Sequence, residues 1–290
     1  MKVLILGADG MIGHKMAQSL NKVHGIEIIL NSRSHSKFLS QLYPKCSIYK
    51  YDFFKDDINN LLNITGPDLI INALGITIRR GAEDFQKASL INSIFPHKID
   101  KWVTKFDKKL IHFSTDCVYS GSKGDYLDND IPDAEDNYGK SKATGEVNSE
   151  NTLTIRCSII GREIFNKTEL LEWVISNKNK KINGFKNVIY SGVTSLWMSK
   201  AIVKIFKEQP GLNGVYNVSS EPISKFDLIS KINKHFKLNI DIDADSSFFS
   251  NKSLNSSKFF LKSNIDKPDW DEMLINLYND SKKNKNLYNL

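Results

Sequence analysis

The sequence has few cysteines and lacks a long hydrophobic run. Three cysteines occur among 290 residues, and Cys46, Cys117 and Cys157 lie far apart without a CxxC pair. This spacing excludes a disulfide framework and a cysteine-based zinc site, and it is typical of a reducing compartment. No apolar stretch reaches the roughly 18 residues of a membrane span, and the apolar start of the chain meets Gly7 too early for a signal peptide. We therefore expect a cytoplasmic protein with no membrane partner.

The chain also lacks a block of charge of one sign. Lys and Arg number 40 against 33 Asp and Glu, and the formal charge of +7 comes from lysines that are scattered along the chain. A dispersed excess of this kind favours a solvated surface and an anionic small substrate over a nucleic-acid partner. The 6 histidines show no ligand-like spacing, so no metal site is expected.

Short apolar runs alternate with helix-length segments through the first half of the chain. Such an alternation predicts an α/β fold with a doubly wound parallel sheet, a Rossmann fold, that binds ligands at the carboxyl ends of its strands. The expected strands are 3–6, 27–30, 47–51, 69–72, 110–114 and 153–156, and the expected helices include 12–23, 85–106 and 137–150.

The rhythm becomes irregular in the second half. Helices are expected at 169–176, 195–208, 225–235 and 270–280, and the polar tail from Lys282 onward is expected to fray. We place a dinucleotide-binding domain at residues 1–162. Residues 163–290 are expected to form mainly a smaller α/β substrate domain, with some segments returning to the first domain.

A glycine-rich turn follows the first expected strand and opens the first expected helix. It reads Gly7-Ala8-Asp9-Gly10-Met11-Ile12-Gly13, a GxxGxxG spacing that differs from the GxGxxG fingerprint. Glycines allow a tight turn and a close approach of pyrophosphate, and the helix N-terminus offers free N–H groups to it. A structural turn without a ligand is the alternative. We expect dinucleotide contacts from Gly7, Gly10, Met11, Ile12 and Gly13.

The end of the second expected strand bears on the choice of cofactor. An acidic residue at this place binds the ribose 2′-OH of NAD, whereas an arginine accommodates the 2′-phosphate of NADP. The sequence here is Asn31-Ser32-Arg33-Ser34, which has no carboxylate. Arg33 and the hydroxyl of Ser32 or Ser34 would bind a phosphate, so NADPH is favoured over NADH.

Tyr138 and Lys142 form the candidate reaction centre. They are four residues apart on an expected helix and therefore share one face. A neighbouring ammonium, together with a positively charged nicotinamide ring, favours phenolate. We therefore expect a lowered pKa for a tyrosine that delivers a proton to a ketone. Upstream, Ser114 and Thr115 end a strand, and Thr115 can hydrogen-bond the substrate carbonyl. Because strand residues alternate between faces, only one of these two hydroxyls should face the substrate.

Four motifs occur in an order that resembles a known family. They are the glycine turn, Asn72-Ala73-Leu74-Gly75, Ser114-Thr115-Asp116-x-Val118-Tyr119 and Tyr138-Gly139-Lys140-Ser141-Lys142. Together they resemble the extended short-chain dehydrogenase/reductase superfamily, and within it the dTDP-4-dehydrorhamnose reductase branch. The resemblance implies NAD(P)H-dependent reduction of the 4-keto group of a nucleotide-linked 4-keto-6-deoxy sugar, for cell-surface polysaccharide biosynthesis. It implies Thr115, Tyr138 and Lys142 as the catalytic residues.

The resemblance also implies further contacts to cofactor and substrate. Asp52 and Phe53 match adenine-binding positions, and Arg156-Cys157-Ser158 matches the stretch that borders the nicotinamide. Cations near an anionic linker suggest Arg162 and Lys186 for the diphosphate. Besides the glycine-turn and catalytic residues, the expected cofactor contacts are Ser32, Arg33, Asp52, Phe53, Ala73, Leu74, Gly75, Asn92, Ser114, Cys157 and Ser158, and the expected substrate contacts are Thr77, Asp116, Cys117, Val118, Arg162, Trp173 and Lys186.

Several positions depart from the family pattern. Cys117 stands where this branch has an aromatic residue, and the stretch 184–192 also differs. A UDP-linked 2-acetamido-4-keto sugar is therefore an alternative to dTDP-4-dehydrorhamnose. An NAD-dependent nucleotide-sugar epimerase or dehydratase, and a non-catalytic regulatory subunit with the same fold, are alternative functions. A homodimer is a further expectation, because dimers are common among similar proteins.

Overall fold

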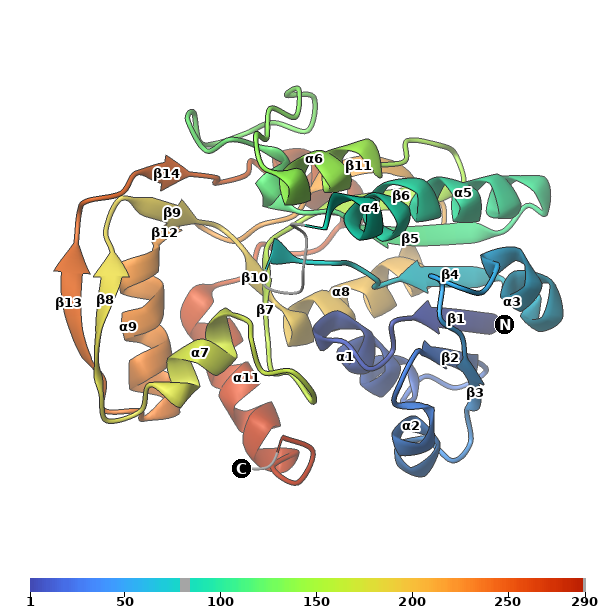
Figure 1. Cartoon of the computed structure of the whole chain (residues 1–290), viewed down its shortest axis with the longest axis horizontal. Coiled ribbons are helices and arrows are strands. Elements are labelled where there is room, and N and C mark those ends of the chain that lie inside the picture. The colour runs from blue at the N-terminus through green and yellow to red at the C-terminus, as the bar shows by residue number, and fades with distance from the viewer. Residues whose placement is uncertain (79–83, 289–290) are drawn as a thin grey trace.

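The computed structural model describes residues 1–78 and 84–288, which form a sheet flanked by helices and a smaller lobe (Figure 1). Seven parallel strands lie in the order β11-β6-β5-β4-β1-β2-β3. The order reverses between β1 and β4, and such a switch point opens a ligand crevice at the carboxyl ends of the strands. The strands are β1 (Lys2–Leu6), β2 (Glu27–Ser32), β3 (Ser47–Lys50), β4 (Leu69–Asn72), β5 (Lys109–Phe113), β6 (Thr152–Arg156) and β11 (Gly214–Asn217).

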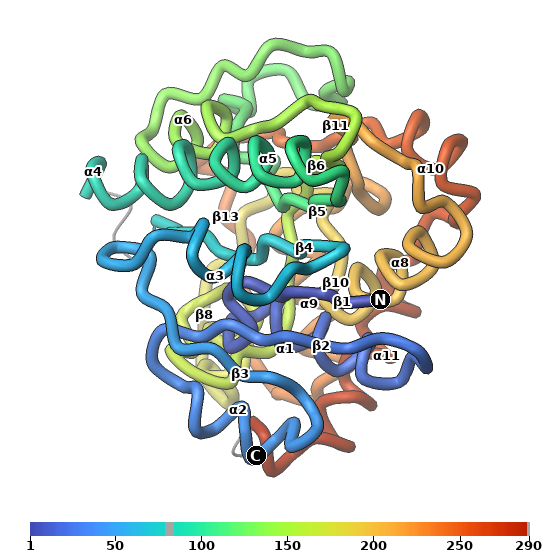
Figure 2. The backbone as a smooth tube through the Cα atoms, turned by 90° about the vertical axis from the view of Figure 1, so that its right-hand side faces the viewer, coloured from blue at the N-terminus to red at the C-terminus, as the bar shows by residue number. Residues whose placement is uncertain are grey.

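Both faces of the sheet are covered by helices (Figures 1 and 2). In β1, Val3 and Ile5 pack into the core under one helical layer, whereas Leu4 and Leu6 pack into the core on the opposite face. This two-sided burial explains why the strand is apolar throughout. The first layer holds α1 (Met11–Leu20), α2 (Ser36–Leu42) and α8 (Ser195–Glu208), and the second holds α3 (Ile58–Thr65), α5 (Phe95–Lys105) and α6 (Asn137–Thr144).

The smaller lobe is built from short strand pairs beside the sheet (Figure 1). Three of its pairings are parallel: β8 with β13, β7 with β10 and β9 with β14. On its other side β9 pairs with β12 in antiparallel orientation. The elements are β7 (Ile159–Ile160), α7 (Leu170–Ser176), β8 (Lys181–Phe185), β9 (Val188–Tyr190), β10 (Val193–Thr194), β12 (Ile223–Ser224), α9 (Lys225–Phe236), β13 (Asp241–Asp245), β14 (Ser250–Asn251), α10 (Ser257–Ser263) and α11 (Trp270–Lys283).

We propose a division of the chain near residue 162, with two later segments returning to the first unit. Strand β11 pairs with β6 at the edge of the large sheet, and α8 packs against α1. The remaining elements after residue 162 supply the smaller lobe and the C-terminal helices.

The doubly wound fold and the six strands expected from the sequence are confirmed, with bounds that differ by one or two residues. The expected helix 85–106 is instead α4 (Phe85–Ala88), a π-helical turn at Ser89–Ile94, and α5. The expected helix 137–150 ends at Thr144, where Gly145 packs against the π-helical turn. A Cβ on Gly145 would lie 1.7 Å from the Asn92 carbonyl oxygen, so only glycine fits there.

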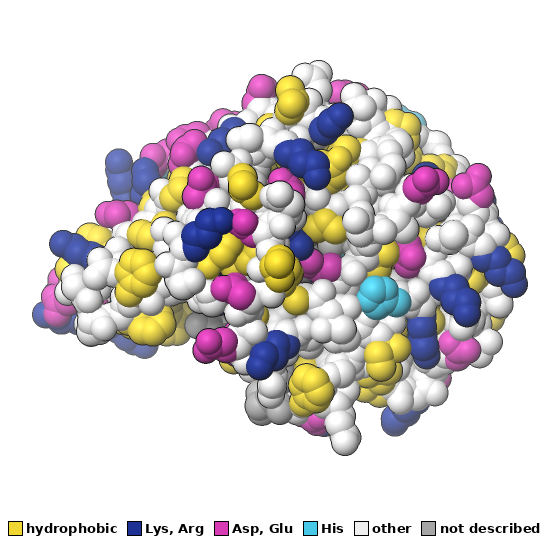
Figure 3. Space-filling view, turned by 90° about the horizontal axis from the view of Figure 1, so that it is seen from above, with side chains coloured by type: hydrophobic (Ala, Val, Ile, Leu, Met, Phe, Trp, Pro, Cys, Tyr) yellow, Lys and Arg dark blue, Asp and Glu magenta, His cyan; other side chains and the backbone are white. Residues whose placement is uncertain are grey.

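The surface carries charges of both signs. On the face drawn in Figure 3, Lys and Arg side chains are interspersed with Asp and Glu. Across residues 1–78 and 84–288, no helix is long and apolar enough to cross a membrane. The same residues contain no cluster of three His, Cys, Asp or Glu side chains arranged to hold a metal ion.

Candidate active site

The glycine turn lies between β1 and α1 and requires glycine at two positions, one for its backbone conformation and one for lack of space. Gly7 has a φ of +72°, a left-handed conformation that favours glycine. A Cβ on Gly13 would lie 2.1 Å from the Gly7 carbonyl oxygen, so helix and turn pack at van der Waals limits. Gly10 caps α1 without a side-chain hydrogen bond, which leaves the first N–H groups of the helix available to an anion.

This turn borders a groove made of two adjoining cavities, of about 840 Å³ and 310 Å³. Four residues line both cavities, so one extended ligand can span them: Gly10, Ala73, Leu74 and Gly75. Of the other expected cofactor contacts, the larger cavity is lined by Gly7, Arg33, Asp52 and Phe53, and the smaller by Met11, Ile12, Ser114, Tyr138, Lys142, Cys157 and Ser158.

Three expected cofactor contacts lie behind the groove instead of lining it. Gly13 is packed against the turn, and Ser32 is buried with its hydroxyl donating to Asp9 over 2.8 Å. Asn92 is fully buried, and its amide bonds the backbone of Ile76. These residues position the walls of the groove.

A carboxylate from the glycine turn lies beside the end of β2. Asp9, in the glycine turn, accepts a hydrogen bond from Ser32 and pairs with Nδ1 of His35 over 2.7 Å. The His35 ring stacks on Phe165 with centroids 3.5 Å apart. Arg33 is exposed on the same cavity wall, with its guanidinium over the Phe54 ring. Asp9, His35 and Phe165 were not predicted, although a carboxylate inside the glycine turn is visible in the sequence.

The three expected catalytic side chains meet in the smaller cavity. Thr115, Tyr138 and Lys142 all line it, Thr115 from the end of β5 and the other two from α6. Helix α6 begins where Asp136 accepts a hydrogen bond from the Gly139 N–H, at 2.8 Å. This cap fixes the first turn of the helix, on which Tyr138 lies.

Lys142 is buried against the neighbouring strand. Its Nζ donates to the carbonyl oxygen of Phe113 over 2.6 Å, and the residue is 3% exposed. Burial penalises the ammonium and lowers the pKa of Lys142 to about 8. The lysine therefore loses its charge in a pH range where an ordinary lysine keeps it.

The expected lowering of the Tyr138 pKa is wrong for this structure. Burial raises the pKa of the phenol, the nearby carboxylates of Asp116 and Glu169 raise it further, and a hydrogen bond with Thr115 opposes them only in part. Tyr138 is consequently a protonated phenol at neutral pH and can act as a proton donor.

The two hydroxyls at the end of β5 make different contacts. Ser114 donates to Oε1 of Glu146 over 2.7 Å, and Glu146 in turn forms a buried ion pair with Arg156. The Thr115 hydroxyl donates to Asp116 over 3.1 Å and accepts from the Cys117 N–H. Both residues line the smaller cavity, but the Ser114 hydroxyl is bound to a carboxylate that is itself ion-paired, so Thr115 is the hydroxyl better placed for a ligand oxygen.

Only two of the seven expected substrate contacts line the groove. Thr77 and Cys117 do so, and the Thr77 hydroxyl donates to Glu169 over 3.0 Å. Asp116 lies beneath the surface, and Val118 packs in a small apolar cluster. The remaining three are absent from the described residues that line either cavity: Arg162, Trp173 and Lys186.

The prediction that Arg162 binds the diphosphate is wrong, because its side chain is buried and already paired. Arg162 is 1% exposed and pairs with Glu172, Nε to Oε1, at 2.7 Å. Its charge is thus neutralised inside the protein. Lys186 is exposed and lies over the Phe226 ring. Both are cations whose partners are set by tertiary packing, which the sequence pattern does not reveal.

Comparisons with known proteins place the chain in a family. A family model described as RmlD substrate binding domain matches residues 1–181. The spore coat polysaccharide biosynthesis protein SpsK of Bacillus subtilis is 26% identical over 230 residues, which are 77% of this chain and 74% of that protein.

Solved structures are similar to this chain over nearly its whole length. The hypothetical dTDP-4-dehydrorhamnose reductase of Sulfolobus tokodaii is 26% identical with a TM-score of 0.76, over 93% of this chain and 96% of that one. The dTDP-4-dehydrorhamnose reductase of Bacillus anthracis in complex with NADP has a TM-score of 0.76 at 20% identity, over 96% and 99% of the two chains, and shows the fold alone. The resemblance drawn from the motifs is confirmed. Because the family model spans more than half of the sequence, this chain belongs to the RmlD substrate binding domain family.

Proposed function

We propose that this protein uses a nicotinamide cofactor to reduce the 4-keto group of a nucleotide-linked 4-keto-6-deoxy sugar, for the synthesis of a cell-surface polysaccharide. The observation that supports it best is the convergence of Thr115, Tyr138 and Lys142 on a cavity that continues into the groove of the glycine turn. The name of the Sulfolobus tokodaii relative agrees with this class of reaction, and the name of the Bacillus subtilis relative agrees with polysaccharide synthesis.

The residues of the chain fit a dinucleotide. The glycine turn is a cradle that a Cβ at Gly13 would fill, and the uncapped start of α1 offers N–H groups to the phosphates. When bound, the cofactor supplies the hydride. The protein supplies the proton, because the raised pKa of Tyr138 keeps its phenol protonated beside the ligand carbonyl.

Thr115 and Lys142 support this proton transfer. The Thr115 hydroxyl hydrogen-bonds the carbonyl oxygen as negative charge develops on it. The ammonium of Lys142, on the same face of α6, stabilises the phenolate that remains after Tyr138 gives up its proton. Each role follows from residues that line one cavity of about 310 Å³.

NADPH is the proposed form of the cofactor. Arg33 and Ser34 line the larger cavity and can bind a 2′-phosphate, whereas Ser32 is committed to Asp9. The relative from Bacillus anthracis was solved with NADP. For the sugar, Thr77 and Cys117 are the proposed contacts, and the nucleotide is dTDP or UDP, the latter with a 2-acetamido sugar.

Cofactor oxidation with defined sugars tests the proposal. Loss of nicotinamide absorbance is followed with NADPH or NADH and enzymatically prepared dTDP- and UDP-linked 4-keto-6-deoxy sugars. Oxidation that needs one of these sugars and falls at least about 100-fold in Tyr138→Phe supports the reductase. Interconversion of sugar epimers without net oxidation indicates the epimerase instead. Dinucleotide binding with no turnover of any sugar indicates the regulatory subunit.

A homodimer and a cytoplasmic location stay predictions. Light scattering of the purified protein tests the first, and fractionation of the source cells tests the second.

A further inference from the structure

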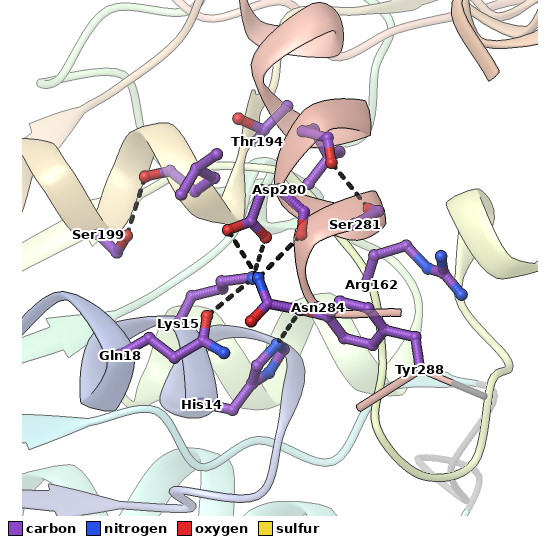
Figure 4. A network of polar contacts seen from close by, with 12 residues as sticks. His14, Lys15, Gln18, Arg162, Thr194, Ser199, Asp280, Ser281, Asn284 and Tyr288 are labelled. Atoms are coloured by element: carbon purple, nitrogen blue, oxygen red, sulfur yellow. Dashed lines mark hydrogen bonds and ion pairs between the residues drawn. The ribbon is translucent and has the colours of Figure 1, made fainter. Parts of the chain in front are cut away.

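Between Lys282 and Tyr288, the C-terminal tail does not fray as its polar sequence suggests. After α11 the chain turns back, and Tyr288 is buried with 0% of its surface exposed. Figure 4 shows this side chain pointing toward His14 and Lys15 on α1, with Arg162 on its other side. A residue at the far end of the sequence therefore lies directly behind the helix that the glycine turn opens.

A chain of two hydrogen bonds links Tyr288 to this turn. The Tyr288 hydroxyl lies 3.0 Å from Nε2 of His14, and Nδ1 of His14 lies 2.8 Å from the carbonyl oxygen of Gly10. A carbonyl oxygen can only accept, so Nδ1 carries the proton. Nε2 must then accept, and the Tyr288 hydroxyl is its donor.

The protonation states of both residues agree with this direction. Burial and the nearby charge of Lys15 lower the pKa of His14 to about 3, so its imidazole is neutral. Burial raises the pKa of Tyr288, so its phenol keeps the proton that it donates. The donor and the acceptor of each hydrogen bond therefore stay the same around neutral pH.

Two cations from distant parts of the chain lie against the Tyr288 ring (Figure 4). Lys15 Nζ lies 5.2 Å from the ring centroid and the Arg162 guanidinium 4.8 Å from it. Each cation is paired, Lys15 with Asp280 of α11 and Arg162 with Glu172 of α7. The backbone of Tyr288 is held too, because Lys167 Nζ donates to its carbonyl oxygen at 3.0 Å.

The Gly10 carbonyl has a direct geometric relation to the phosphate site. It accepts from the backbone N–H of His14 at 3.0 Å as well as from the imidazole. In a trans peptide the C=O and the following N–H point in opposite directions. Fixing this carbonyl toward His14 therefore fixes the Met11 N–H outward from the start of α1, on the side where the groove lies.

We propose that Tyr288 is a positioning residue for the phosphate-binding turn, acting through His14 on the peptide between Gly10 and Met11. This inference rests on the proposed function, since it assumes that the turn binds a dinucleotide. Tyr288 is not among the described residues that line either cavity of the groove. Its effect is on the affinity for the diphosphate that all nicotinamide dinucleotides share.

Cofactor affinity of the Tyr288→Phe variant tests this role. NADPH and NADH are titrated into the full-length protein, and binding is followed by nucleotide fluorescence. Loss of one neutral hydrogen bond is expected to weaken both dinucleotides by roughly three- to tenfold and to an equal extent, with kcat at saturating cofactor retained. Tyr278→Phe is the matched control, since Tyr278 lies on α11 and packs against Phe236. The affinity of this control variant for both dinucleotides should be unchanged.

A double-variant cycle with His14→Asn tests the route. Asparagine is too short to span both partners, so adding Tyr288→Phe to this variant should cause no further loss of affinity. Additive losses would overturn the route through His14. Unchanged affinity in Tyr288→Phe, even with a lower unfolding midpoint, would overturn the positioning role and leave a structural one. Absence of dinucleotide binding by the unaltered protein would overturn the proposed function itself, and with it this inference.

Discussion

Asn92 binds both backbone polar groups of Ile76. Its Oδ1 accepts from the Ile76 N–H and its Nδ2 donates to the Ile76 carbonyl oxygen, each over 2.9 Å. The same Nδ2 donates to the Ser141 hydroxyl over 3.0 Å. One buried amide in the π-helical turn thus joins the loop after β4, which lines the groove, to the helix that carries Tyr138 and Lys142.

Asn92→Ala is expected to lower the free energy of unfolding by about 1–3 kcal/mol, because the backbone groups of Ile76 lose their partners. We also expect a lower kcat/KM, since the loop and α6 are no longer tied together. Urea unfolding and steady-state kinetics measure the two effects. Asn276→Ala, an exposed change on α11, is the control, and an equal loss in both variants would contradict a special role of Asn92.

Lys142 should impose an alkaline limit on activity. Its pKa is lowered from 10.5 to about 8, so the charged fraction falls as the pH rises through that value. The raised pKa of Tyr138 keeps the phenol protonated over the same range. We expect kcat/KM for sugar reduction to decline above about pH 8. The pH–rate profile checks this, and a rate that stays level for about two pH units beyond the midpoint would rule out Lys142 as the group responsible.

Arg33 is expected to discriminate between the two forms of the cofactor. Arg33→Ala removes the cation that would bind a 2′-phosphate, so KM for NADPH should rise at least about tenfold while KM for NADH changes little. Lys37→Ala, a change to an exposed lysine four residues away, is the control. Equal effects on NADPH and NADH would show that the 2′-phosphate does not bind at Arg33.

His14 is expected to make the protein sensitive to acid. Its pKa is about 3 in the folded chain against 6.5 for an ordinary histidine, so below pH 6.5 the unfolded chain binds the proton more readily. The contribution of His14 to stability is fully present above pH 6.5 and is lost as the pH falls toward 3. Urea midpoints between about pH 7 and pH 4.5 should fall less in His14→Asn than in the unaltered protein. A parallel fall in both would refute the assignment.

Local patterns in the sequence predicted the frame of the molecule. Strands such as Leu69–Asn72 carry apolar residues on both faces. In the turn 7–13, Gly7 and Gly13 are required by the backbone geometry of the turn itself, so the motif can be recognised from a short stretch of sequence. The motif order also brought Thr115, Tyr138 and Lys142 together in one cavity, although their roles remain predictions.

Contacts between distant segments could not be predicted in this way. The partner of Arg162 depends on how α7 packs, and the sign of the Tyr138 pKa shift depends on how deeply the phenol is buried. Tyr288 lies in a polar tail, and its burial requires a pocket that α1 and the segment after β7 form only in the folded chain. Strand β11 was not predicted either, because only two of its four residues, Val215 and Tyr216, are apolar.

The pairing of β11 with β6 has a consequence for synthesis on the ribosome. Strand β6 ends at residue 156 and its outer neighbour begins at residue 214. A nascent chain that has completed the reaction-centre segment therefore still has an unpaired edge strand. Unpaired edges recruit other strands, and aggregation follows. We expect a recombinant fragment ending near residue 162 to aggregate more readily than the chain that includes β11, the strand that covers this edge of the sheet.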